Sequence, residues 1–288
     1  MKIENKYLDG TKLWGDDFNY KKLLSWYKDE KEGYSSLGQA EDELNFYPYE
    51  RLNFVHGFKK ISEIKFNNVL GFGSAGGQEF EQIKERVNKL TIIDPSEKYG
   101  KKKLFNRYCK YIKPSVSGKL RFKDNTFDLV TCLGVLHHIP NVTYVLREIY
   151  RCLIPGGVVL IREPIISMGD WTKPRPGLTK RERGIPLSVF RKIIFEAGFQ
   201  LRSEDYCMFV GFQKIMNWFH VRPYNNNLLT FIDSVFSYLF AWNIKYFTTN
   251  QFFKIRPTCI FYVLEKPPEE LKDQNFKNLS NKPNSYVD

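Results

Sequence analysis

The sequence of 288 residues is poor in cysteine, and none of its five cysteines has the C-x-x-C spacing of zinc and redox sites. An odd number of scattered cysteines does not build a disulfide framework either. We therefore expect no metal site and five reduced, buried packing residues: Cys109, Cys132, Cys152, Cys207 and Cys259. The first residues also lack the apolar segment and small-residue cleavage site of a secretory signal. The expected location is the cytosol.

Long apolar runs are also missing. The most apolar stretch, residues 228–247, is barely long enough to cross a bilayer, and Asp233 and Lys245 interrupt it. A membrane-spanning helix is therefore not expected.

Acidic residues are too few to balance the basic ones. Lys and Arg number 44 and Asp and Glu number 32, which gives a formal net charge of +12. This charge favours an anionic partner such as nucleic acid, anionic lipid or a phosphate-bearing substrate, but it does not choose among them. Because the lysines are dispersed, a solvated surface without any partner is an equally good interpretation.

From Asn68 onward, short apolar runs alternate with turns and helical patterns. The runs cover residues 69–72, 90–93, 127–133 and 158–162. Strands that alternate with helices predict a parallel sheet with right-handed crossovers, hence a doubly wound α/β fold. Ligands of such sheets bind beyond the carboxyl ends of the strands.

The chain divides into one α/β domain with additions. We predict a helical N-terminal cap over residues 1–65 and the α/β domain over residues 66–266. A helical insertion at about 211–252 precedes the closing strand, and the polar tail 267–288 is expected to be disordered.

A glycine-rich turn follows the first strand of the domain. Residues 69–77 read Val-Leu-Gly-Phe-Gly-Ser-Ala-Gly-Gly, and a helical pattern begins near Gln78. Glycines let the backbone approach a ligand closely, while the free N–H groups of the next helix face it. Many nucleotide cofactors use such a turn, so this motif alone is weak.

A carboxylate ends the next strand. Asp94 closes the run Thr91-Ile-Ile-Asp about one βα unit after the glycines, where an acid accepts hydrogen bonds from both ribose hydroxyls. Asp94 is also suited to capping a helix whose first residue is Pro95. We favour the ribose.

Two further segments, residues 124–140 and 146–157, resemble the fourth-strand and fifth-strand motifs of class I S-adenosylmethionine-dependent methyltransferases. With the glycine turn and Asp94, the resemblance covers roughly residues 68–199. It implies a Rossmann-like sheet of seven strands whose last strand is antiparallel, with S-adenosylmethionine across the ends of the first two strands. The cofactor site expected from it consists of Gly71, Gly73, Ala75, Gly77, Asp94, Ser117, Leu133 and Gly134.

The sequence departs from the family pattern at three places. Gly71 stands where the family has an acid at the end of the first strand, and Ala75 replaces the middle glycine. Near Ser117 there is no carboxylate for the adenine amino group, so we expect backbone groups or Ser117 to bind the adenine. These departures keep a second hypothesis open, a noncatalytic methyltransferase-like scaffold or partner protein.

Methyl transfer to a hydroxyl group profits from a general base. His138, just beyond the fourth strand, is our first choice, and His137 and Glu163 are the other candidates. The alternative is that a histidine only packs under the following helix or lines the cofactor pocket.

The acceptor is expected to be a small molecule or glycan. The run 181–186 resembles methyltransferases that modify surface polysaccharide precursors, which suggests a sugar hydroxyl. The arginines 175, 181 and 183 would either bind an anionic group of this acceptor or pair with acids inside their loop. Quinone or lipid methylation would suit the aromatic insertion and RNA methylation the charge, although Leu133-Gly-Val stands where an Asn/Asp-Pro-Pro-Tyr motif would favour RNA.

The insertion has an apolar helical face and a narrow polar strip formed by Asp233, Ser234 and Ser237. Two interpretations remain open. The segment is either a lid packed over the acceptor pocket, or a surface helix whose residues 228–247 contact a membrane. We favour the lid, because apolar helices usually bury themselves in protein.

Overall fold

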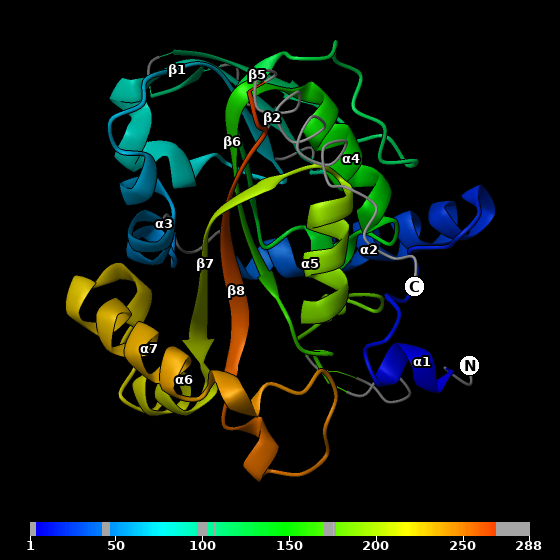
Figure 1. The fold of residues 1–288 in the computed structure, drawn as a ribbon, viewed down its shortest axis with the longest axis vertical. Coiled ribbons are helices and arrows are strands. Elements are labelled where there is room, and N and C mark those ends of the chain that lie inside the picture. Colours follow the sequence, from blue (N-terminus) through cyan, green and yellow to red (C-terminus); the bar gives the residue numbers. More distant parts are fainter. Residues whose placement is uncertain are drawn as a thin grey trace, which may run out of the picture.

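The computed structural model describes residues 4–41, 47–96, 103–105, 107–169, 175 and 177–268. Nearly all of the tail predicted to be disordered lies outside these residues. A single mixed sheet with the strand order β3-β4-β2-β1-β5-β6-β8-β7 forms the centre of the molecule (Figure 1).

The sheet is doubly wound, as predicted. β8 runs antiparallel to both of its neighbours, β6 and β7, while β4, β2, β1, β5 and β6 are mutually parallel. These seven strands confirm the expected fold, and the two-residue β3 adds an eighth as a hairpin with β4. The strands are β1 (Phe66–Phe72), β2 (Val87–Ile93), β3 (Lys103–Leu104), β4 (Arg107–Ile112), β5 (Phe127–Leu133), β6 (Leu153–Pro164), β7 (Gln200–Phe209) and β8 (Pro257–Glu265).

Helices surround the sheet. The first three, α1 (Asn5–Leu8), α2 (Tyr20–Glu41) and α3 (Glu50–His56), form the helical N-terminal segment. Those of the domain are α4 (Val142–Cys152), α5 (Leu187–Glu196), α6 (Val210–Trp218) and α7 (Asn227–Leu239). The 3-10 turns are η1 (Phe58–Ile61), η2 (Gln78–Arg86), η3 (Leu136–His138), η4 (Pro223–Asn225), η5 (Ala241–Asn243) and η6 (Phe252–Lys254).

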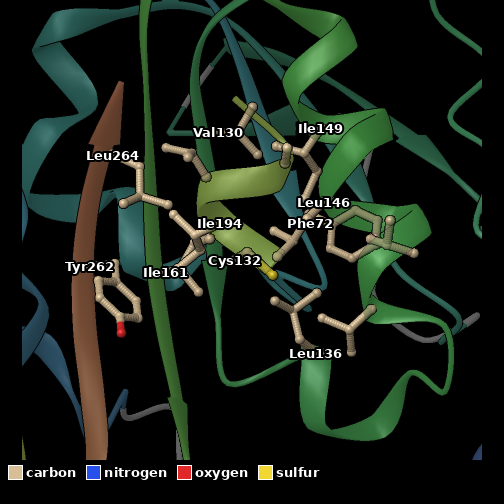
Figure 2. Packing of buried hydrophobic residues seen from close by; sticks show 14 of the residues in the cluster. Phe72, Val130, Cys132, Leu136, Leu146, Ile149, Ile161, Ile194, Tyr262 and Leu264 are labelled. Carbon is tan, nitrogen blue, oxygen red and sulfur yellow. The ribbon is translucent and has the colours of Figure 1, made fainter. Parts of the chain in front are cut away.

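Both faces of the sheet are buried, which explains why its strands read as continuous apolar runs. On one face, Phe72, Val130 and Ile161 of the strands pack with Leu146 and Ile149 of α4 and with residues of α5 (Figure 2). The other face packs against α3, η1 and η2. All five cysteines are free and buried, as expected from their spacing.

The expected burial of the apolar face of the insertion is wrong. In α7 the polar residues Thr230, Asp233 and Ser237 are fully buried, whereas Leu228, Phe231 and Tyr238 are exposed. The reason is Asp233, whose carboxylate accepts the backbone N–H groups of Met208 and Phe209 at the end of β7, at 2.8 and 2.9 Å. These contacts turn the polar strip of α7 toward the sheet and its apolar face outward.

Candidate active site

The residues predicted from the strand ends meet at one edge of the sheet. β1, β2, β5 and β6 are parallel, so the glycine turn, Asp94, Gly134 and Glu163 all lie at or just beyond their carboxyl ends. This is the edge at which doubly wound folds bind their ligands.

The glycine turn has the backbone that its sequence suggests. Gly73 and Gly77 have φ angles of +72° and +73°, and Ala75 also has a positive φ of 43°. A Cβ on Gly73 would lie 2.5 Å from the side chain of Val135, so this glycine is also required by a neighbouring loop of the protein. The helical pattern after the turn forms η2, which is a 3-10 rather than an α-helix.

Asp94 joins the end of β2 to the glycine turn. One carboxylate oxygen accepts the N–H of Ala75 at 2.9 Å, and the other accepts the N–H of Ser96 at 2.8 Å. The bond to Ser96 is the one expected of a capping residue, but the bond to Ala75 is not. Each oxygen keeps a second acceptor site, which suits a ribose diol. Burial raises the pKa of Asp94, and the two backbone hydrogen bonds oppose this shift.

Glu79 is a buried acid at this edge that the sequence analysis did not select. Its buried carboxylate accepts the hydroxyls of Ser74 at 2.9 Å and Thr131 at 2.5 Å. Thr131 is paired with Gly71 in the sheet, and a Cβ on Gly71 would lie 2.4 Å from the Ser74 Oγ. Gly71 therefore leaves room for the hydroxyl of Ser74, which donates to Glu79. Burial raises the pKa of Glu79.

Arg162 is a second charged residue that sequence reasoning did not select. Its guanidinium is buried, donates to Asn53 Oδ1 at 2.9 Å and stacks 4.0 Å from the ring centre of Tyr49. Within the described part of the chain, no carboxylate lies at ion-pair distance from it. Its charge nevertheless acts on Glu79 and lowers that pKa against the larger effect of burial. Two opposite buried charges thus lie near each other without forming an ion pair.

Glu163 and His137 form a hydrogen-bonded pair at the end of β6. The Glu163 carboxylate is fully buried and accepts the backbone N–H groups of Val135, Leu136 and His137. It also lies 2.7 Å from His137 Nδ1. Because an ionised carboxylate only accepts, Nδ1 carries the proton and Nε2 offers a lone pair. Glu163 is therefore placed to position His137 rather than to act as a base itself.

His138 is turned toward the N-terminal helix. Its Nδ1 lies 2.8 Å from Glu30 Oε2 of α2, and its backbone carbonyl accepts the indole N–H of Trp26 at 2.7 Å. Burial and the neighbouring His137 lower its pKa. Glu182 also lies near this histidine, and the hydroxyl of Thr179 donates to Glu182 as well as to Glu30. These contacts connect His138 to the N-terminal segment and favour His137 as the base.

The remaining predicted residues divide between the site and its surroundings. Ser117 follows β4, and its carbonyl accepts the amide of Asn141 at 2.9 Å, beside the start of α4. Leu133 is buried in the core, whereas a Cβ on Gly134 would meet Arg162 Nη2 only at 3.5 Å. Because Gly134 has no side chain, none of its atoms lies between its backbone and the guanidinium of Arg162.

The arginines of the loop after β6 bind the protein itself. Arg183 is fully buried and donates to the backbone carbonyls of Trp14, Leu136, His137, Ile139 and Pro140. Arg181 pairs with Asp29 of α2 at 2.7 Å, and Arg175 donates to four carbonyls of its own loop. Among the described residues, their partners are mainly backbone carbonyl oxygens rather than the acids of their own loop.

The segment that forms this edge is also matched in a comparison with known proteins. Residues 70–161, which carry the glycine turn, Asp94, both histidines and most of β6, match the family model of a methyltransferase domain. This segment of the chain is therefore similar to a methyltransferase domain. The methyl donor of this family is S-adenosylmethionine. The chemistry of Asp94 fits its ribose, and that of Glu79 and Arg162, which do not pair with each other, fits its amino-acid end.

Curated relatives of this methyltransferase domain act on different molecules. The tRNA U34 carboxymethyltransferase of Nautilia profundicola is 32% identical over 114 residues, and the ubiquinone biosynthesis O-methyltransferase of Dechloromonas aromatica is 37% identical over 98 residues. These matches span 36% and 32% of this chain, and only 36% and 42% of the two relatives.

Solved structures share the fold of this chain at low sequence identity. A Galdieria sulphuraria protein proposed to be a sarcosine dimethylglycine methyltransferase has a TM-score of 0.50 at 14% identity, covering 73% of this chain and 83% of its own. A Haloferax volcanii protein in complex with the Trm112 methyltransferase activator has a TM-score of 0.50 at 11% identity, covering 83% and 98%.

Proposed function

We propose that this protein transfers the methyl group of S-adenosylmethionine to a hydroxyl group of a small organic acceptor. The observation that carries the proposal is the pair His137 and Glu163, which lies at the same edge of the sheet as the ribose-binding candidate Asp94. A histidine whose Nδ1 is hydrogen-bonded to a buried carboxylate is suited to accept a proton at Nε2.

The residues of this edge suit the three polar parts of the methyl donor. Asp94 would accept the ribose hydroxyls, as the resemblance implies. Glu79 has the negative charge for the ammonium group, and Arg162 has unused N–H donors for the carboxylate. A ligand that brings both of these charges would neutralise two buried groups that lack an ion-pair partner among the described residues.

Methyl transfer requires the protein mainly to align the two reactants and to supply a base. The sulfonium supplies a methyl group on a good leaving group, so the rate depends mainly on holding the acceptor oxygen in line and excluding water. As the oxygen–carbon bond forms and the carbon–sulfur bond breaks, His137 Nε2 takes the hydroxyl proton. Glu163 stabilises the resulting imidazolium through Nδ1.

The acceptor proposed from the sequence is a sugar hydroxyl of a polysaccharide precursor, modified in the cytosol. A lipid-soluble hydroxyl, such as that of a quinol, is the second candidate. The exposed apolar face of α7, a helix that packs against α3 and β7, favours this candidate. One of the relatives named above, the ubiquinone biosynthesis O-methyltransferase, is consistent with it.

A radiolabel transfer assay tests the proposal and separates the two acceptor classes. The purified protein is incubated with methyl-labelled S-adenosylmethionine and either nucleotide sugars or short-chain quinols, and the products are separated by chromatography. We expect label in one class, and its loss in His137→Gln. Label transfer that His137→Gln leaves unchanged would contradict the assigned base, and no transfer to any hydroxyl compound would contradict the proposed reaction.

A further inference from the structure

Helices α6 and α7 and the segments that follow them present many large apolar side chains to the exterior. We call this set the α6–α7 surface. Trp218 is 79% exposed, Tyr238 76% and Trp242 69%. The other members are Ile215, Phe219, Val221, Leu228, Phe231, Val235, Phe236, Leu239, Phe252 and Ile255. So many exposed apolar side chains in one segment of the chain typically mark a site of interaction.

The orientation of α7 is fixed, so the exposure is a stable property of the fold. Asp233 is fully buried and accepts hydrogen bonds from two backbone N–H groups at the end of β7 and from the hydroxyl of Tyr224 at 3.1 Å. Rotating α7 to bury its apolar face would expose Asp233 and leave those N–H groups without a partner. A lid that turns its apolar face inward would have to break this network.

The exposed charged residues of the segment that carries this surface have one sign. Residues 210–256 contain five lysines and arginines but a single acid, Asp233, whose carboxylate is buried. Lys214, Arg222 and Lys245 are exposed among the apolar residues. A second copy of this chain would bring these like charges together, which disfavours self-association through this surface.

We propose that the α6–α7 surface docks on an anionic lipid membrane. Tryptophan and tyrosine favour the boundary between headgroups and acyl chains, and the basic side chains meet the negative charge of the lipid. No helix within the described ranges is long and apolar enough to span a bilayer, so the contact is peripheral.

Docking in this way would place the candidate active site beside the membrane. β8 is antiparallel to both β6 and β7, so β6 and β7 end at the same edge of the sheet, and α6 follows β7 directly (Figure 1). α7 also packs against α3, the helix that carries Asn53, the partner of Arg162.

Vesicle sedimentation tests the docking without a methyl donor or an acceptor, so its result does not depend on the proposed function. The full chain is mixed with vesicles of phosphatidylcholine alone or with added phosphatidylglycerol. We expect sedimentation with the anionic vesicles, together with a blue shift of tryptophan emission and release by high salt. Failure to sediment with anionic vesicles at low salt would overturn the proposal.

Two variants identify the surface, and a third is their control. Trp218→Ser with Trp242→Ser removes the aromatic anchors, and Lys214→Glu with Lys245→Glu reverses two charges. Each should weaken vesicle binding by more than about tenfold. The control, Tyr108→Ser with Phe195→Ser, removes two aromatic residues that are 73% and 80% exposed elsewhere, and it should bind like the parent protein.

Two results would assign the surface differently. Equal vesicle binding by the parent protein and both surface variants would show that another part of the chain meets the lipid. Light scattering that gives a dimer mass for the parent protein and a monomer mass for the tryptophan variant would assign the surface to a second copy of the chain. Either result overturns the proposal, and thermal melts establish that every variant is folded.

Discussion

Replacing Glu79 by glutamine removes a buried negative charge and changes little else. Glutamine has the same length, and its amide oxygen can still accept the hydroxyls of Ser74 and Thr131. If Glu79 binds the ammonium group of the methyl donor, the variant loses a charged hydrogen bond, which contributes about 1.5–3 kcal/mol. The dissociation constant of S-adenosylhomocysteine should then rise between about tenfold and about 150-fold.

A truncated ligand separates this effect from a general loss of structure. 5′-Methylthioadenosine has the same nucleoside and sulfur but lacks the amino-acid end, so Glu79→Gln should bind it as tightly as the parent protein does. Calorimetric titration with both ligands measures the difference. The matched control is Glu81→Gln, an exposed glutamate on the same turn η2, which should leave both affinities unchanged.

The pH dependence gives a second readout of the same contact. Burial raises the pKa of Glu79, so its carboxylate becomes protonated at a higher pH than an exposed glutamate does. The ammonium group needs the ionised form. Affinity for S-adenosylhomocysteine should therefore fall as the pH is lowered toward this raised pKa, and Glu79→Gln should remove that dependence. An equal loss of affinity for both ligands would refute the assigned contact, because Glu79 would then only support the turn.

Three further outcomes follow from the site and its surroundings. His137→Gln should leave the affinity for S-adenosylhomocysteine unchanged while lowering kcat by roughly 10²- to 10⁴-fold; a large change in affinity instead would refute the role as base. Asp233→Ala leaves two backbone N–H groups unpaired and should lower the free energy of unfolding in urea by about 2–5 kcal/mol. Burial lowers the pKa of His138, so the unfolded chain binds more protons than the folded protein does. The free energy of unfolding should therefore fall as the pH drops below about 6.5. His138→Gln should make this decrease shallower.

The sequence predicted the parts of the fold that local patterns encode. The apolar runs and the turns after them identified the parallel strands, and the position of Asp94 one βα unit after the glycines identified the acid at the end of β2. These features depend on neighbours in the chain. Of the two histidines, however, the sequence pattern favoured His138 as the base. The pattern could not show that this side chain faces Glu30, because that contact depends on the packing of α2.

Other features depend on contacts between distant segments. Glu79 looks like an ordinary glutamate near the start of a helix. Only the structure shows that it reaches Thr131, the residue paired with Gly71 between β1 and β5. The face of α7 was misjudged for a similar reason. Its apolar periodicity is real, but Asp233 binds the end of β7 and decides which side is buried.

The central claim is that this edge of the sheet binds S-adenosylmethionine. Calorimetric titration of the purified protein with S-adenosylmethionine and S-adenosylhomocysteine, with Asp94→Ala as the comparison, tests it most directly. We predict saturable binding of both ligands by the parent protein and strongly weakened binding by the variant. Folded parent protein that binds neither ligand would contradict the claim and would favour a noncatalytic, methyltransferase-like scaffold.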